Sequence, residues 1–386
     1  SPALIPALPY KAVPTSSIVK TIRSDKTRGY ICRQCIQSAA VLTIVAQPLT
    51  DTAVFRPPYV GTEKPFYSVA SLETSLLPSL VPVVSVPEIN SFSEISHLQL
   101  DHKNGAGGTE LHPINSFTDD YGAYIGKRNA DIALRLMLND PIDNKMPLLI
   151  SYTQYGIDLL YMLQLGYRYD DGGGHRPGQK LPMVFAAVML NDDDIKQMVK
   201  ESVHLFHERN LLTYNRDSTR ILYGENQGLT FSLYEEKYWK VVHSIVSTGA
   251  SAGYKSYSDP YGYIDGGAHP GADYQFCCTS QPWKGSVLAL KLMPPLAEVW
   301  NDTMTISYVE RWVASGAWAQ PDPCAPADST WENYGVTFGP DGNGGCIKDR
   351  DSTDGIGRWP EKHGEYVDGG NYWSSFQREL WQKYYH

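Results

Sequence analysis

A short loop carries three kinds of side chain that can do proton and charge chemistry. In the stretch "GGGHRPGQK", residues 172–180, His175 can exchange a proton near neutral pH, Arg176 can hold a carboxylate bidentately, and Lys180 adds a second positive charge. The consecutive glycines permit backbone conformations that other residues avoid. The pattern predicts a substrate-facing loop; the alternative is a tight connection between two packed helices.

A second loop, "GYKSYSDPYGYIDGGAHPGADYQFCCTSQPWKG" at residues 253–285, is rich in tyrosine. Tyr263 is the first choice for a proton donor, because it lies beside Gly262 in a flexible setting, and Tyr261 and Tyr254 follow in that order. The other side chains predicted to contact a substrate are Lys180, Asn226, Tyr238, His269, Tyr274 and Trp283.

These residue types suit β-elimination in a uronic acid polymer. The C5 proton of a uronate is weakly acidic, so a cation or an amide must first neutralise the carboxylate. A His or an ionised Tyr then takes the proton, and a Tyr hydroxyl protonates the departing glycosidic oxygen. We expect Arg176 to hold the carboxylate and His175 to act as the base.

Two other function classes fit the same composition. A glycoside hydrolase needs two carboxylates that flank the scissile bond, and Asp170 or Asp171 with Glu235 or Glu236 can be assigned to those roles. Charged pairs of this kind are more often solvated surface or helix caps. A non-catalytic glycan-binding protein would use the same aromatic loops.

The composition restricts the partners. The net charge of -9 argues against a nucleic-acid binder, and an anionic substrate would need a local basic patch. The 26 Tyr and 9 Trp suit a carbohydrate groove, although most rings serve as core and rim. No apolar run is long enough to predict a membrane span. We expect a monomer that binds an anionic polysaccharide and uses no cofactor.

The cysteines and the acidic tail are the candidate metal sites in the sequence. A single C-x-x-C pair, Cys32 and Cys35, has no second copy to complete a zinc site. Asp349, Asp351 and Asp354 lack the spacing of an EF-type calcium loop. We therefore expect no metal.

The cysteine count also bears on the compartment. The six cysteines are even in number and split between loops, which fits an oxidising compartment, and sequence proximity makes Cys324 to Cys346 the expected bridge. The start, "SPALIPALPYKAVP", is typical of a trimmed terminus. The sequence therefore predicts a secreted or periplasmic protein.

Two regions are expected along the chain. Residues 1–115 are rich in proline and predict an irregular, extended lead-in, whereas 116–386 predict a helical catalytic region with a disulfide-bearing tail, and the two together predict a single domain. Apolar spacing predicts helices within 121–140, 150–167, 191–210, 224–247, 283–300 and 304–318. Residues 181–190 predict a buried helix, although their length does not exclude a strand. His207 is expected at the rim of its helix.

The chain resembles a known family in two stretches, "GGGHRPGQKLPMVFAAVMLND" and "YQFCCTSQPWKGSVLALKLM", set in a helical frame after "FRPPYVG". Over residues 115–315 it is similar to the α/α-toroid polysaccharide lyases and their heparinase-like relatives, which include alginate and glucuronan lyases. The resemblance implies an incomplete barrel of antiparallel helical hairpins with long irregular loops. One feature departs from it: "GGGHR" replaces the Asn-Asn-His triplet of some of these lyases, which makes Asn226 a second candidate for neutralising the carboxylate.

Overall fold

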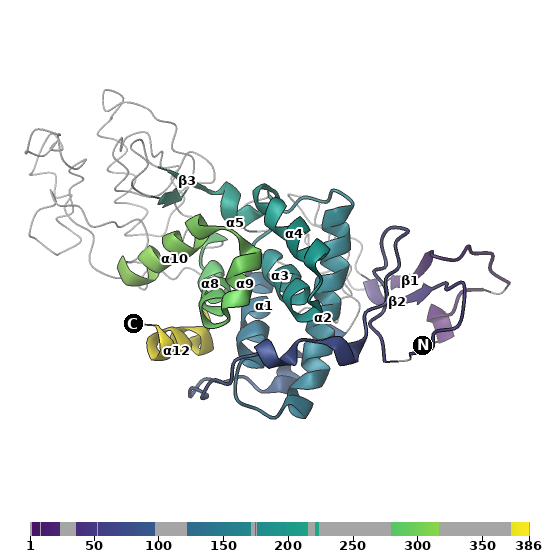
Figure 1. Cartoon of the computed structure of the whole chain (residues 1–386), viewed down its shortest axis with the longest axis horizontal. Coiled ribbons are helices and arrows are strands. Elements are labelled where there is room, and N and C mark those ends of the chain that lie inside the picture. The colour runs from purple at the N-terminus through teal and green to yellow at the C-terminus, as the bar shows by residue number, and fades with distance from the viewer. Residues whose placement is uncertain are drawn as a thin grey trace, which may run out of the picture. The chain divides into compact units, whose positions relative to one another are not determined.

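The structure is a computed structural model (Figure 1), and it describes residues 2–7, 9–23, 36–51, 53–96, 122–170, 174, 176–214, 221–223, 279–315 and 372–385. Helices dominate these residues, which confirms the prediction of a mainly α protein. Within the same residues, no helix combines the length and the apolar character that a membrane crossing requires.

The chain divides into two compact units, each made from separate stretches of sequence. The first unit comprises Ser1–Phe206, Leu288–Asn301 and Ser374–His386, and the second comprises His207–Val287 and Asp302–Trp373. The boundary that we expected after residue 115 falls inside the first unit.

The first unit holds most of the described helices. Its strands are β1 (Ser17–Arg23) and β2 (Ile36–Thr43). Its short 3-10 helices are η1 (Pro2–Leu4), η2 (Val69–Ser71), η3 (Thr74–Leu76), η4 (Ile89–Ser96) and η6 (Val203–Leu205). Its α-helices are α1 (Gly122–Leu136), α2 (Ile142–Gln164), α3 (Lys180–Leu190), α4 (Asp193–Glu201), α9 (Pro294–Trp300) and α12 (Ser375–Tyr384). Helix α8 (Trp283–Leu292) begins in the second unit and continues into the first.

The lead-in is not irregular throughout. β1 and β2 form an antiparallel pair in which Ser17 lies opposite Thr43, with a shift of register between Ile22 and Arg23. The hydroxyls of Ser17 and Thr43 lie 3.4 Å apart. The β-branched residues of both segments favour strands over an extended coil, and the prediction underestimated this signal.

Helix α3 forms the core of the first unit, since every one of its residues is buried. It packs against α2, α4 and α9. The contact with α2 is close because Gly156 has no side chain: a Cβ there would lie 2.2 Å from the carbonyl oxygen of Pro182. The predicted buried helix at 181–190 is confirmed, and a strand is excluded.

Two helix pairs are joined by the same dipeptide turn. Asn191 and Asn301 end α3 and α9 in the left-handed conformation, with φ of 52° and 53°. The next residue then caps the following helix. Asp192 Oδ1 accepts from the backbone N–H of Ile195 at 3.1 Å. Asp302 Oδ1 accepts from the backbone N–H groups of Met304 at 3.1 Å and Thr305 at 3.4 Å. The residue that adopts the left-handed conformation and the residue that caps the next helix are therefore adjacent in sequence in both turns. Helix α4 ends at Glu201, so the predicted helix 191–210 is too long.

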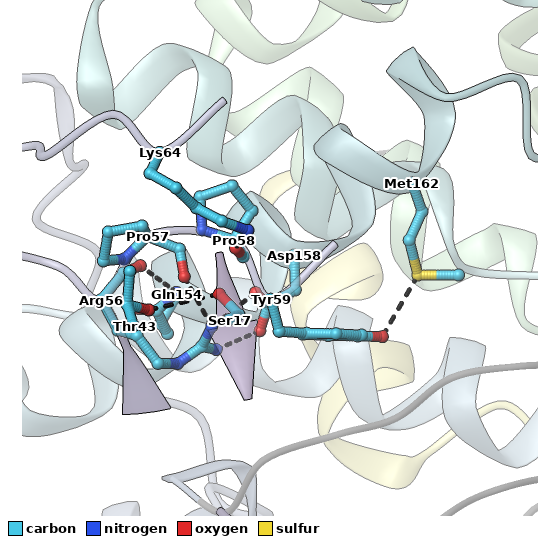
Figure 2. Close-up of polar contacts among 10 residues, drawn as sticks. All are labelled: Ser17, Thr43, Arg56, Pro57, Pro58, Tyr59, Lys64, Gln154, Asp158 and Met162. Atoms are coloured by element: carbon cyan, nitrogen blue, oxygen red, sulfur yellow. Dashed lines mark hydrogen bonds and ion pairs between the residues drawn. The ribbon is translucent and has the colours of Figure 1, made fainter. Parts of the chain in front are cut away.

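The lead-in is tied to α2 by a buried ion pair (Figure 2). Both guanidinium nitrogens of Arg56 donate to the carboxylate of Asp158, whose side chain is only 4% exposed. Gln154 Nε2 donates to the Arg56 carbonyl at 3.0 Å, and the Tyr59 hydroxyl contacts Met162 Sδ at 3.4 Å. Burial raises the pKa of Asp158, and the positive charge of Arg56 opposes that rise.

Helix α12 is held on α1 by one carboxylate. Asp131 Oδ1 accepts from Ser374 Oγ at 2.5 Å and from Gln377 Nε2 at 2.8 Å. Ser374 also caps α12, because its hydroxyl accepts from the Gln377 backbone N–H. Burial raises the pKa of Asp131 to about 6, although the two hydrogen bonds and the Lys127 charge act in the opposite direction.

We expect Asp131→Asn to stabilise the protein near neutral pH. A carboxyl whose pKa is raised on folding gains its proton in the folded state, so stability is lost as pH rises from the ordinary value of 3.8 through about 6. That difference corresponds to about 3 kcal/mol at most. Asparagine keeps an oxygen that accepts both hydrogen bonds and carries no charge, so it should remove this slope. Urea unfolding of both proteins across that pH range tests the prediction, and a variant that is less stable near neutral pH would contradict it.

The second unit is described at fewer positions. It contains α5 (His207–Asn210), the antiparallel pair β3 (Leu212–Tyr214) and β4 (Ile221–Tyr223), the first turn of α8, and α10 (Thr303–Ser315). Helix α10 packs against β4 and α5. The helices predicted within 283–300 and 304–318 are confirmed, although the first divides into α8 and α9 at Met293, where Pro294 and Pro295 begin a new helix.

Candidate functional site

The guanidinium of Arg176 lies against the phenol of Tyr167. Arg176 Nη1 donates to the Tyr167 hydroxyl at 2.7 Å, and the guanidinium carbon lies 5.4 Å from the centre of the ring. Arg176 is buried, whereas Tyr167 is half-buried, so the phenol is the more accessible partner. A guanidinium that donates to a phenol oxygen stabilises negative charge there.

Lys180 lies deeper, at the start of α3. Its side chain is fully buried, with Nζ 4.3 Å from the ring centre of Trp300 and 5.1 Å from that of Phe206. Ammonium groups held over aromatic faces are attracted by the ring electrons. Lys180 is therefore placed as part of the interior and does not lie at a surface.

The loop that leads into α3 is built into the core by its backbone. Gly178 has φ of +86°, and a Cβ there would lie 2.0 Å from Gly126 Cα, so only glycine fits. Asn129 Nδ2 donates to the Gly178 carbonyl at 3.1 Å, and the Tyr155 hydroxyl donates to Gln179 Oε1 at 2.9 Å. Residues 176–180 thus form a tight helix connection, which was the alternative expectation, and Arg176 lies against Tyr167. The prediction of a substrate-facing loop stays a prediction.

A cluster of rings surrounds the start of α8 in the second unit. The ring of Trp283 lies 5.8 Å from that of Tyr308 and 6.4 Å from that of Tyr223, and Tyr308 lies 5.9 Å from Trp312. His207 meets Trp283 edge-on at 5.7 Å and is only 1% exposed. The prediction of a rim position for His207 is therefore wrong, because α5 turns this side chain inward.

Polar groups are interleaved with these rings. The Tyr223 and Thr279 hydroxyls lie 2.8 Å apart, and the Tyr308 hydroxyl donates to Ser280 Oγ at 3.1 Å. Lys284 Nζ lies over a tryptophan ring, 4.0 Å from the centre of Trp373. The segment "TSQPWKGS", residues 279–286, is thus polar in composition and buried in structure.

Most predicted site residues lie outside the described part of the chain: His175, Asn226, Tyr238, Tyr254, Tyr261, Tyr263, His269 and Tyr274. So do all six cysteines, Asp171, Glu235, Glu236 and the acidic tail. Those that are described, Arg176, Lys180 and Trp283, are all buried. Asp170, considered for a hydrolase, pairs with Arg168.

Sequence reasoning missed Tyr167. It lies in "LGYRYDD", directly after α2 and nine residues before Arg176, and the only signal was its proximity to the glycine loop. The polar residues next to Trp283 were also missed. In "CCTSQPWKG" several polar residues directly precede an apolar helical segment, which was the available signal.

Comparison with protein-family models, curated protein sequences and solved structures finds no match. Across the described ranges, no three His, Cys, Asp or Glu side chains are grouped so that they could hold a metal ion. Among the described side chains, the Tyr167 phenol and the Arg176 guanidinium form a hydrogen-bonded pair through which a proton on the phenol can be influenced by a fixed positive charge.

Proposed function

We propose that the protein is a polysaccharide lyase that cleaves a uronic-acid-containing polysaccharide by β-elimination. The observation that carries the proposal is the 2.7 Å hydrogen bond from Arg176 to the hydroxyl of Tyr167. Lyases of this kind need a base that is anionic when it meets the substrate, and a buried guanidinium favours that form of a neighbouring phenol.

The reaction assigns a step to each group. Tyr167 takes the C5 proton of the uronate, the electron pair forms the C4–C5 double bond, the bond from C4 to the glycosidic oxygen breaks, and an acid protonates that oxygen. Arg176 is a positioning residue that stabilises the phenolate. Tyr263 stays the first choice for protonating the leaving oxygen, and Asn226 stays a candidate for neutralising the carboxylate. Tyr167 replaces His175 in the role of base that the sequence analysis gave to His175.

The proposed setting is an α/α toroid. It is supported by the buried helix α3, by its short capped turn to α4, and by the repetition of that turn after α9. Short turns on one side of helical pairs, with long loops on the other, are what such an architecture uses to gather a site. Because the proposed substrate is an anionic extracellular polymer, we also propose that the protein is secreted or periplasmic.

Ultraviolet absorbance tests the proposal. The protein is incubated with alginate, glucuronan and glycosaminoglycans, and a lyase should produce a conjugated unsaturated uronate that absorbs. The matched control is the same polymer with its carboxyl groups reduced to alcohols, which cannot undergo the elimination. New reducing ends without absorbance would indicate a hydrolase, and binding without any cleavage would indicate a glycan-binding protein; either result overturns the proposal.

A further inference from the structure

The turn that ends α9 carries the tripeptide Asn301-Asp302-Thr303. It has the pattern Asn-x-Ser/Thr, in which the asparagine is a potential acceptor of N-linked sugars. The pattern occurs once in the sequence. Because so short a pattern also arises by chance, the case for a modification site must come from the surroundings of Asn301.

The turn between α3 and α4 is an internal comparison, because it repeats the local backbone of the turn after α9. In both turns an asparagine in the left-handed conformation is followed by an aspartate that caps the next helix. The third residue is Asp193 after α3 and Thr303 after α9. The turn itself accounts for the first two residues. It does not account for Thr303, since an acidic residue such as Asp193 is favoured in the first turn of a helix.

Asn301 presents its amide at the surface of the first unit. The residue is exposed, and its Nδ2 donates to the Lys200 carbonyl at 3.1 Å, a contact within that unit. A side-chain amide nitrogen carries two hydrogens. Replacing one of them by a sugar leaves the other to make the hydrogen bond to Lys200. The folded turn can therefore accommodate an attached sugar and keep this contact.

We propose that Asn301 is an attachment site for an N-linked oligosaccharide. The donor is a lipid-linked diphosphate oligosaccharide. The bond from sugar C1 to the donor phosphate breaks, and the diphosphate leaves with its electron pair. A bond from C1 to Asn301 Nδ2 forms, and the amide loses one proton.

The two halves of the pattern act at different times. The transferase recognises the Thr303 hydroxyl in the extended chain, before folding, so only Asn301 and its contact with Lys200 have to suit the folded protein. The inference goes beyond the proposed lyase activity and rests only on the secreted location proposed with it.

Secretion of the full chain from a eukaryotic host tests the site. Peptide N-glycosidase removes N-linked sugars and converts the acceptor asparagine to aspartate. The purified protein should lose mass on this treatment, and heavy-oxygen water should label the peptide that contains position 301. A peptide with unmodified Asn301, found before any treatment and without a glycosylated counterpart, would overturn the proposal.

Two reciprocal substitutions exchange the third residue of the two turns. Thr303→Asp gives the turn after α9 the same tripeptide as the turn after α3, so it should fold and lose the sugar completely. Asp193→Thr creates the acceptor pattern at Asn191, at a side chain that is 93% exposed, and should add a second sugar. Thr303→Ser is the matched control, because it preserves the pattern and should keep the sugar.

These variants also define the results that contradict the site. A sugar that persists in Thr303→Asp would lie elsewhere in the chain. A sugar on Asn191 in Asp193→Thr, with Asn301 bare in the same protein, would show that the host modifies such a turn but not this one. Either result overturns the proposal.

The attachment site and the lyase fail separately. An absorbing product from a uronan, made by a protein with bare Asn301, leaves the lyase standing and the attachment site wrong. A sugar on Asn301, in a protein that gives no absorbing product with any uronan, leaves the attachment site standing and the lyase wrong.

Discussion

Replacing Tyr167 by Phe should lower turnover on a uronan by about 10²–10⁴-fold, the usual effect of losing a general base. The ring stays in place, so packing against Tyr169 and Arg176 is kept and only the proton-accepting oxygen is removed. Substrate binding should change little, and the loss should fall on turnover.

Tyr169→Phe is the matched control. Its hydroxyl donates to the Leu159 carbonyl at a long 3.5 Å, and it lies two residues from Tyr167 on the same segment. It should leave turnover close to the wild-type value. Turnover of Tyr167→Phe at that same level would remove Tyr167 from the mechanism and return the role of base to His175.

The role of Arg176 can be read from the pH profile of the same reaction. Arg176→Gln keeps a donor of similar reach but removes the charge, so the phenolate is less favoured. The rise of turnover with pH should then move to higher pH. If Arg176 had a purely structural role, its replacement would lower activity or stability without shifting the pH at which turnover rises.

Replacing Arg56 by Met should cost about 3–5 kcal/mol in the free energy of unfolding, because it leaves the buried carboxylate of Asp158 without its cation. The loss should shrink at acid pH, since protonation removes the unpaired charge. Asp158→Ala should cost less, because the Arg56 side chain is 25% exposed and can turn toward water.

The double variant Arg56→Met with Asp158→Leu should recover much of that stability, since neither charge then remains buried. Lys196→Met is the control: its partner Asp193 is 93% exposed, and such pairs contribute about 0–1 kcal/mol. Chemical denaturation measures all four variants, and equal losses for Arg56→Met and Lys196→Met would contradict the prediction.

The helices could be predicted because their signal is local. The apolar run at 181–190 and the capping residue Asp192 identify α3 and α4 from a few neighbouring residues. The two strands of the lead-in were missed because proline-rich neighbours outweighed their β-branched residues. The signal for these strands was present in the sequence, but it was given too little weight.

The site could be predicted only in part, since its contacts join distant positions. Arg56 and Asp158 are 102 residues apart, and nothing in either neighbourhood specifies the other. The loop around Arg176 was recognised from its composition, but its contact with Tyr167 depends on how α2 ends. The inward turn of His207 likewise follows from the packing of α5, which residue type alone does not determine.

The contact between Asp131 and Ser374 also constrains the order of events during synthesis. The ribosome completes residues 207–287 and 302–373, which belong to the second unit, before α12 emerges. Until then Asp131 lacks the two hydrogen bonds from Ser374 and Gln377, and the surface of α1 that receives α12 is uncovered. The first unit therefore contains both the first and the last residues to be synthesised. All of the second unit is synthesised before α12 can pack on α1 and complete the first unit.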